Sequence, residues 1–382
     1  MGQLPLSNVV VVDLSRVLAG PLSSMVLGDL GADVIKVEHP LRGDDTRDWG
    51  IQISPGNTSY YYSFNRNKRS IALDLTTDEG REAVRTLCAK ADIIVENFKA
   101  GGMEKFGLGY DTLKQLNPRL IYCAISGYDR YGSEGPRPGY DLVIQGESGL
   151  MAINGEAEQA PLKFGVAAVD LFTGMYAAQA ILGALYERER TGQGRRIDLA
   201  LYDCGIMISS YYGLEALLKG EDPPRFGNSH PSIVPYGVFD AADGQLVIAV
   251  GTNRQFASLC EVLGCQDLGR DQRFSTNLLR SKNRDTLLPL LTSKLAVHSR
   301  SELLRQIAAA GIPCGEVVGL HDALTSPRTR EAGLVTQLDH PEAGETPVLT
   351  PPWRFDGSRV PVRRPPMLNE HSAEIRASLL AK

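Results

Sequence analysis

The feature that most constrains the fold is an alternation of strand, helix and strand near the start of the chain, which then recurs. Residues 9–12 are a continuous run of valines, which suits a strand buried on both faces of a parallel sheet. Pro21 falls near the start of an apolar helix that ends around Gly28 and Gly31, and residues 33–38 read as the next strand. The sequence therefore predicts a βαβ unit here.

The same alternation continues through the N-terminal half of the chain. Strands are predicted over 70–75, 92–96, 121–126 and 196–201, and helices over 77–90 and 166–190. Repeated βα alternation predicts an α/β fold with a Rossmann-like, mostly parallel sheet that carries helices on both faces.

The 382 residues are too many for one continuous core. A linker rich in proline, asparagine and glycine begins near residue 223 and leads into a compact α+β stretch with a strand over 245–250. We predict a large domain over 1–222, completed by 325–382, and a small α+β domain over 223–324. The proline-rich residues 347–366 predict an extended strap rather than a packed element.

Composition excludes several protein classes. Hydrophobic residues make up 43% and charged residues 22%, as in an ordinary soluble enzyme, and the net charge of −5 argues against nucleic-acid binding. The six cysteines form no C-x-x-C pair, which predicts buried, reduced thiols. No signal peptide and no uninterrupted apolar span of membrane length is evident, so we expect a cytoplasmic protein without a membrane partner.

The chain lacks the sequence signatures of several common enzyme classes. The chain has no phosphate-binding P-loop, no H-E-x-x-H zinc motif, no calcium loop and no G-x-S-x-G elbow. The first βα turn, residues 13–21, reads DLSRVLAGP and lacks G-x-G-x-x-G, so dinucleotide binding is disfavoured although Glu38 ends the second strand. We predict no metal and no permanently bound cofactor.

Asp170 opens the long apolar helix predicted over 166–190. Read from the residues alone, an acid in the first turn of a helix caps amides and complements the helix dipole. The same position is expected to keep the carboxylate ionised, and hence nucleophilic, at neutral pH.

Segments along nearly the whole chain together resemble one enzyme family. They include RVLAGP, LGADVIKVEHP, GDDTR, ADIIVENFKAGG and TGQGRRIDLALYD, in this order and at these spacings. The chain thereby resembles the class III (CaiB/BaiF-type) coenzyme A transferases, a family that includes α-methylacyl-CoA racemases. The resemblance implies an interlocked homodimer, acyl-CoA and carboxylic acids as substrates, and Asp170 as the nucleophile.

The mechanism implied by the resemblance needs neither ATP nor metal. Asp170 attacks an acyl-CoA thioester to give a mixed anhydride and CoA thiolate, and the thiolate then forms an aspartyl-CoA thioester. An incoming carboxylate displaces CoA through a second anhydride. Backbone amides near the start of the Asp170 helix are the expected donors to each oxyanion.

Two further regions take their roles from the resemblance. The covering loop would contain Asn228, Ser229 and His230, and its one glycine, Gly227, argues against oxalate and formyl-CoA as substrates. The CoA site would be lined by Val17, Leu18, His39, Leu73, Asn97, Phe98, Lys99, Lys105 and Arg137, with Arg47 as a further cation. His39 stands where an arginine is common, which would give a weaker and pH-dependent contact.

Tyr140 and Asp141 separate the two branches of the family. Racemases place a histidine at the position of Tyr140 and a glutamate near the position of Asn253, and this chain has neither. Asp141 would line the active site, cap the helix that follows it, or do both. A racemase or epimerase and a non-catalytic CoA-binding homologue remain the alternatives.

The identity of the acids is the least constrained part of this interpretation. A dicarboxylate acceptor with succinyl-CoA as donor is favoured, because polar residues could meet the distal carboxylate. The candidates for that contact are Arg16, Asn67, Arg69 and Arg254.

Overall fold

The computed structural model describes residues 3–380, which form two compact units. The first unit contains residues 3–150, 163–215 and 327–380, and the second contains residues 151–162 and 216–326. The predicted boundary at residue 222 falls near this division, but the grouping of residues 151–162 with the second unit was not predicted. The terminal residues 1–2 and 381–382 of the predicted ranges lie outside the described residues.

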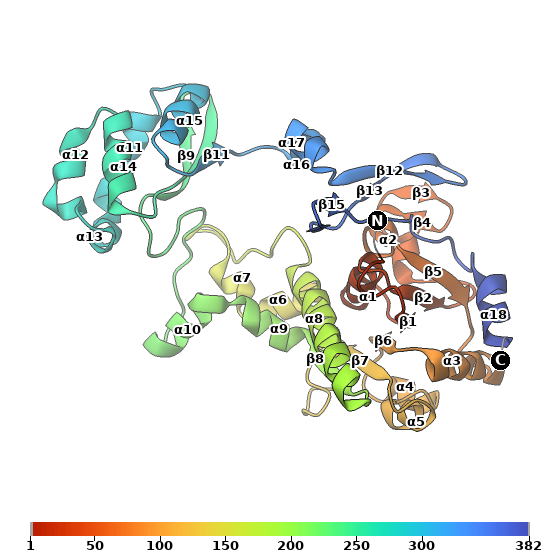
Figure 1. Ribbon diagram of the computed structural model, residues 1–382. Coiled ribbons are helices and arrows are strands. Elements are labelled where there is room, and N and C mark those ends of the chain that lie inside the picture. Colours follow the sequence, from red (N-terminus) through yellow and green to blue (C-terminus); the bar gives the residue numbers. More distant parts are fainter. Residues whose placement is uncertain (1–2, 381–382) are drawn as a thin grey trace. The chain divides into compact units, whose positions relative to one another are not determined.

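A six-stranded, all-parallel sheet forms the centre of the first unit (Figure 1). Its strand order, β5-β2-β1-β6-β7-β8, is that of the Rossmann fold and confirms the predicted α/β class. The strands are β1 (Val10–Asp13), β2 (Asp33–Glu38), β5 (Lys68–Ala72), β6 (Ile93–Glu96), β7 (Ile121–Ser126) and β8 (Arg196–Ala200). Strand order reverses direction between β1 and β6, the place where such sheets bind ligands.

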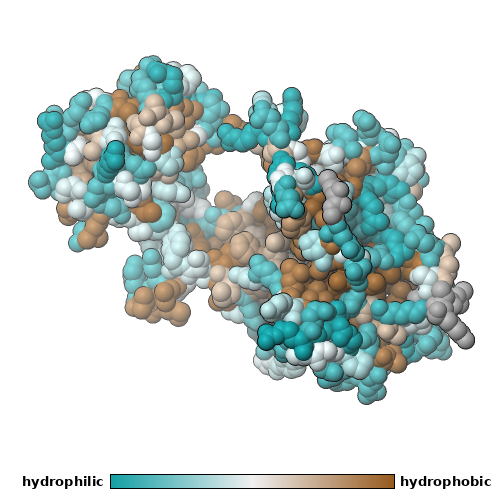
Figure 2. Space-filling model, viewed as in Figure 1, coloured by the Kyte–Doolittle hydropathy of each residue, from teal (hydrophilic) through white to brown (hydrophobic). Residues whose placement is uncertain are grey.

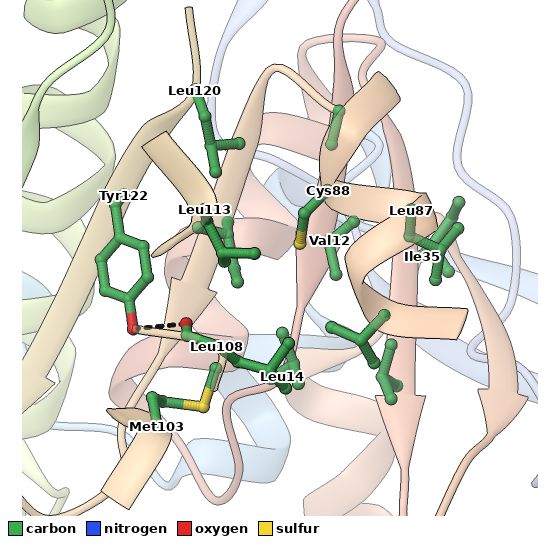
Figure 3. Close-up of a cluster of buried hydrophobic side chains, with 14 of the residues drawn as sticks. Val12, Leu14, Ile35, Leu87, Cys88, Met103, Leu108, Leu113, Leu120 and Tyr122 are labelled. Carbon is green, nitrogen blue, oxygen red and sulfur yellow. Dashed lines mark hydrogen bonds between the residues drawn. The ribbon is translucent and has the colours of Figure 1, made fainter. Parts of the chain in front are cut away.

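Helices α3 (Asp78–Lys90) and α5 (Tyr110–Leu116) cover one face of this sheet. Their buried side chains share a cluster with Val12 of β1 and Tyr122 of β7 (Figure 3). The Tyr122 hydroxyl donates a hydrogen bond to the Leu108 carbonyl at 3.4 Å, so this large polar side chain is accommodated in the core. Helix α18 (Ser372–Leu380) adds Ile375 to the same cluster.

Helices α1 (Ala19–Asp29) and α8 (Ala168–Thr191) pack closely on each other and contact the sheet through β2 and β7 (Figure 1). Every residue of α1 is buried. Among the described helices, only α8 has the length and apolar composition to span a membrane, and half of its most apolar stretch is buried within the protein. Its packing against α1 is that of a core helix.

Gly174 allows α1 and α8 to approach each other. A Cβ at this position would lie 2.7 Å from the Ala19 carbonyl oxygen and 2.9 Å from a methyl group of Leu22. We expect Gly174→Ala to push α8 away from α1 and to lower the free energy of unfolding by about 1–3 kcal/mol. Urea denaturation tests this expectation, with Gly183→Ala as the control, because Gly183 of the same helix has open space around its Cβ position. Equal stability of the two variants would contradict the close approach.

Three buried ion pairs involve residues of β1, β2 and β5. Asp13 pairs with Lys68 at 2.9 Å, Lys36 with Asp44 at 2.8 Å, and Glu38 with Arg47 at 2.7 Å. The Arg47 guanidinium also lies over the Tyr61 ring, and Arg47 as a whole residue is only 3% exposed. The expectation that Arg47 adds charge to a CoA site is therefore wrong, because Glu38 and buried backbone carbonyls already satisfy it.

The C-terminal segment of the first unit is more structured than the sequence predicts. A two-stranded hairpin of β12 (Val335–His340) and β13 (Gly344–Leu349) precedes a short hairpin of β14 (Arg354–Phe355) and β15 (Ser358–Arg359). Only the part after residue 359 is an extended strap, and its Arg363 backbone exchanges hydrogen bonds with Asn67. Pro347 lies within β13, so the proline content concealed a strand. The remaining elements of this unit are η1 (Asp45–Asp48), β3 (Gln52–Ser54), β4 (Asn57–Thr58), α2 (Ser59–Phe64), α4 (Gly102–Lys105), α6 (Asp141–Glu147), α9 (Leu201–Ile208) and α17 (Pro327–Ala332).

The second unit is a small α+β body around its own core. A three-stranded antiparallel sheet, ordered β11-β10-β9, packs with five helices. Helix α10 (Ser210–Lys219) crosses the boundary between the two units. The other elements are α7 (Leu150–Ile153), β9 (Tyr236–Ala241), β10 (Gly244–Ala249), α11 (Asn253–Val262), α12 (Gln266–Arg270), η2 (Gln272–Phe274), α13 (Asn277–Lys282), α14 (Arg284–Leu295), α15 (Arg300–Ala309), β11 (Cys314–Glu316) and α16 (Leu320–Thr325). All six cysteines of the chain are free thiols, five of them buried, as the sequence predicts.

Candidate active site

A cleft of about 500 Å³ opens in the first unit at the carboxyl ends of β1, β6 and β7. It lies at the point where the strand order reverses, the usual ligand position of an open parallel sheet. The structure brings many of the predicted site residues together on its walls. They are Val17, Leu18, Asn97, Phe98, Lys99, Lys105, Arg137, Tyr140 and Asp170.

Asp170 is the third residue of α8 and is partly accessible from the cleft. Burial raises the pKa of its carboxyl group to about 7, and the negative charge of Asp141 adds to the rise. The expectation that the helix N-terminus alone keeps this carboxylate ionised at neutral pH is therefore wrong. Loss of hydration and a like charge together outweigh the helix dipole.

Asp141 caps the helix that carries Asp170, and not the helix that it begins itself. Its Oδ1 accepts hydrogen bonds from the N–H groups of Val169 at 2.8 Å and Asp170 at 3.3 Å. Its Oδ2 accepts one from Gln145 at 2.6 Å, while Tyr140 is the N-cap residue of α6 and makes no side-chain capping bond. The prediction that Asp141 caps the helix that follows it is thus wrong. Since Asp141 occupies them, these two amides are not available to an oxyanion.

The turn before α1 supplies other amides to the cleft. Val17 has a φ of +72°, which is unusual for a β-branched residue, and Leu18 and Ala19 follow it along the cleft wall. Among residues 3–380, the N–H groups of Leu18 and Ala19 have no hydrogen-bond partner. These two donors, at the N-terminus of α1, can meet negative charge that develops beside Asp170.

A second, smaller cavity of about 190 Å³ is lined by the other two residues predicted to bind CoA, His39 and Leu73. It shares four wall residues with the cleft of Asp170, namely Arg16, Asp45, Phe98 and Phe106. His39 is exposed, and its Nδ1 accepts a hydrogen bond from the Leu41 N–H at 3.2 Å. The two cavities adjoin, so a long ligand could extend from one into the other.

The cations on the cleft wall differ in how they are paired. Lys99 and Lys105 are exposed, and neither forms an ion pair within the described part of the chain. Arg137 is paired with Glu134 and with Glu147, and its guanidinium lies 4.4 Å from the centre of the Tyr128 ring. Lys99 and Lys105 are consequently the better partners for phosphate groups.

We expect the double variant Lys99→Ala/Lys105→Ala to raise KM for an acyl-CoA roughly tenfold, because two unpaired cations that face the cleft are lost. The turnover number should stay within about twofold of wild type, since neither lysine faces the reacting atoms in this interpretation. Steady-state kinetics at low and high salt provide the measurement, with exposed Lys114→Ala as the control. An unchanged KM would exclude the two lysines from the CoA site.

Of the four residues proposed to meet a distal carboxylate, the three in the first unit do not come together. Arg16 lines the cleft and pairs with Asp45 at 3.2 Å on the surface. Asn67 instead bonds to Asp29 and to the strap, and Arg69 pairs with Asp33 and Glu374. Arg254 lies on α11 of the second unit. For Asn67 and Arg69 the prediction was wrong, because both have structural partners.

Asn228, Ser229 and His230 belong to the second unit. The Nδ1 of His230 accepts hydrogen bonds from the N–H groups of Ser232 and Ile233, each at 3.1 Å, which orders the loop locally. The covering role of this loop stays a prediction. In the same unit, Asn253 accepts a hydrogen bond from the buried Arg280 at 3.0 Å, and it is no substitute for the glutamate that racemases place nearby.

Tyr60 is a candidate that sequence reasoning missed. It lies on the short helix α2, and burial together with the charges of Asp170 and Asp141 raises the pKa of its hydroxyl to about 12. Tyr60 therefore stays neutral and can donate a hydrogen bond near the Asp170 carboxylate. No local pattern marks it, because Asp141 and Asp170, whose charges act on its hydroxyl, lie 81 and 110 positions away along the chain.

Comparisons with known proteins agree with this geometry. Residues 6–372 match CoA-transferase family III. The chain is 39% identical to the succinate–glutarate CoA-transferase of Agrobacterium fabrum, covering 98% of this chain and 96% of that one. It is 38% identical to the human succinyl-CoA:glutarate CoA-transferase, over 98% and 86% of the two chains. The solved structure of a CaiB/BaiF family protein from Brucella suis has a TM-score of 0.86 and 43% identity, covering 99% of this chain and all of that one. With Asp170 in a cleft at the switch point of a Rossmann-like sheet, the chain belongs to CoA-transferase family III.

Proposed function

We propose that the protein transfers coenzyme A from succinyl-CoA to a second dicarboxylate, with glutarate as the first candidate. The observation that carries the proposal is the position of Asp170, a carboxylate with access to a cleft whose wall also carries Lys99 and Lys105, which form no ion pair in the described part of the chain. The relatives named for succinyl-CoA and glutarate align with almost the whole chain and support this choice of acids. No separate cofactor is needed, because CoA is itself the group transferred.

The first half-reaction exchanges two acyl bonds at Asp170. Its carboxylate oxygen attacks the thioester carbonyl, the C–S bond breaks, and a mixed anhydride and CoA thiolate result. The thiolate then attacks the Asp170 carbonyl carbon and releases succinate, which carries away one oxygen of Asp170. The thioester bond is conserved as aspartyl-CoA, so the exchange needs no external energy source.

The second half-reaction runs the same steps in reverse with the acceptor. Glutarate attacks the aspartyl-CoA carbonyl to give the second anhydride, and the thiolate then attacks the glutaryl carbonyl. Each step forms a tetrahedral oxyanion, which the N–H groups of Leu18 and Ala19 can stabilise from the α1 N-terminus. Asp141 holds the backbone at Asp170 and so fixes the direction of the nucleophile.

Mass spectrometry of CoA esters tests the proposal. Purified protein is mixed in heavy water with succinyl-CoA and one acceptor acid. Glutarate, mesaconate and acetate are tested as acceptors in separate reactions. Formation of glutaryl-CoA and succinate is the expected result. Deuterium at an α-carbon without a new ester would instead show the α-proton exchange on which racemases depend. No new ester with any acceptor, beside detectable binding of succinyl-CoA, would establish a CoA-binding homologue without transferase activity.

We propose further that the protein is the interlocked homodimer implied by its family, in the cytoplasm. Helix α10 has no buried residue, and its Leu214, Leu217 and Leu218 are 59%, 83% and 78% exposed. Figure 2 shows the resulting apolar patch over this helix, at the lower left of the view. A patch of this kind favours burial against a second copy of the chain. Light scattering during size-exclusion chromatography would separate a dimer from a monomer.

A further inference from the structure

In the turn from Ser15 to Leu18, the two peptide groups on either side of Arg16 are held by side chains from other elements. Buried Lys36 donates a hydrogen bond to the Ser15 carbonyl at 2.9 Å. The Asn97 side chain accepts one from the Arg16 N–H at 2.9 Å and donates another to the Arg16 carbonyl at 2.8 Å. Asp44 then accepts one from the Val17 N–H at 3.2 Å.

Asp44 is itself fixed in the core, where it is 1% exposed. The Lys36 ammonium lies 2.8 Å from its Oδ2, and Lys36 is fully buried. Its Oδ1, which receives Val17, also accepts hydrogen bonds from the N–H and hydroxyl of Thr46 at 3.0 and 2.8 Å. Lys36 thus holds both the start of the turn and the residue that holds its end. A displacement of this pair would move the whole turn.

The fixation keeps Val17 in an unfavourable backbone conformation. At a φ of +72° the Val17 side chain is crowded by its own backbone, and such conformations persist only where surrounding contacts impose them. Released from its partners, Val17 would relax to a negative φ and rotate the peptides of Leu18 and Ala19. Those residues line the cleft with Asp170 and carry the two N–H groups that have no hydrogen-bond partner within residues 3–380.

We propose that Asn97 and Asp44 are positioning residues of the transferase, which hold Val17 left-handed so that the amides of Leu18 and Ala19 stay on the wall facing Asp170. The proposal rests on the proposed function. It also revises the prediction that Asn97 contacts CoA. The oxygen and the nitrogen of the Asn97 side-chain amide are both hydrogen-bonded to the Arg16 backbone, so Asn97 acts on the turn and not on CoA.

The test compares Asn97→Ala with Asn117→Ala. Asn117 is a matched control, because its side-chain amide also bonds only to backbone groups, those of Cys88, Ala91 and Arg119, in another loop of the same unit. We expect Asn97→Ala to lower kcat roughly tenfold to a hundredfold with KM for succinyl-CoA within about threefold, and Asn117→Ala to leave kcat unchanged. A rise in KM alone, or an equal loss of kcat in both variants, would overturn the positioning role.

A second substitution tests the backbone conformation directly. Glycine adopts positive φ without steric cost, so Val17→Gly should restore part of the kcat lost in Asn97→Ala, at least about threefold. No gain in the double variant would contradict the role of the Val17 conformation. Asp44→Asn is the companion variant, and its kcat should fall likewise if it folds.

Amide hydrogen exchange over residues 15–19 separates the positioning role from the transferase function, since it needs no substrate. Protection of the hydrogen-bonded amides of Arg16 and Val17 should fall at least tenfold in Asn97→Ala and stay unchanged in Asn117→Ala. Unchanged protection in Asn97→Ala would overturn the proposal even if the protein is an active transferase. A wild-type protein that transfers no CoA would instead overturn the proposed function. The amide hydrogen exchange data would still decide whether Asn97 fixes the turn.

Discussion

Asp170→Ala is expected to abolish CoA exchange, with kcat at least about a thousandfold below wild type. Alanine cannot form an anhydride or an aspartyl-CoA thioester, and no other carboxylate of the described chain lines the cleft except Asp45, which is paired with Arg16. The measurement is the rate of glutaryl-CoA formation from succinyl-CoA. Residual exchange within about tenfold of wild type would exclude Asp170 as the nucleophile.

Asp170→Asn supplies the control for folding, because it keeps the shape of the side chain. The pKa of Asp170 is raised from its ordinary value to about 7 in the folded protein, so the ionised group destabilises the fold. Its contribution to stability is fully present below the unfolded pKa and is lost as pH rises through about 7. Asp170→Asn should thus be inactive yet more stable than wild type, with a difference in Tm that grows from about pH 5 to about pH 8. A less stable variant would leave misfolding as the cause of its inactivity.

The rate should also depend strongly on pH. With the pKa of Asp170 near 7, the nucleophilic carboxylate is a minor species in acid, and its fraction falls about tenfold for each pH unit below the pKa. We expect kcat/KM for succinyl-CoA to rise about a hundredfold between about pH 5 and about pH 8 and then to level off, because this parameter reports the free enzyme. A flat profile over this range would contradict a raised pKa at the nucleophile.

Asp141→Asn tests the second cause of that raised pKa. Asparagine can still accept the hydrogen bond from the Val169 N–H, but it removes the negative charge beside Asp170. The midpoint of the pH profile should move to lower pH with the same substrates, while burial keeps it above the ordinary aspartate value. Since the substrates titrate identically in both enzymes, an unchanged midpoint would assign the profile to a substrate or to another residue.

The sequence predicted the parts of this fold that depend on local hydrophobic pattern. Strands β2 and β7 occupy the residues expected for them, because continuous apolar runs between turn signals identify buried parallel strands. The hairpin of β12 and β13 escaped notice, because proline and charged residues conceal the pattern of a strand exposed on one side. Hydrophobic pattern thus predicts those strands that are buried on both faces.

Some features of the candidate site were likewise predicted from the sequence, and others were not. Asp170 lies in one cleft with eight of the other residues that the resemblance indicated. The resemblance could not show that Asp141 caps the Asp170 helix, that Asn97 holds Arg16, or that Tyr60 lies near the nucleophile. Each of these contacts joins residues distant along the chain, and their effects on the pKa and the backbone arise only from tertiary packing.

The central claim, that Asp170 is acylated by both acids in turn, is tested most directly by oxygen-18 transfer. Each complete turnover places one oxygen of the acceptor carboxylate on Asp170, because the thiolate cleaves the second anhydride at the acyl carbon of the acceptor. After turnover of succinyl-CoA with oxygen-18 glutarate, the peptide containing Asp170 should become heavier, and fragmentation should locate the label at this residue. Rapid formation of glutaryl-CoA with an unlabelled Asp170 would contradict the account.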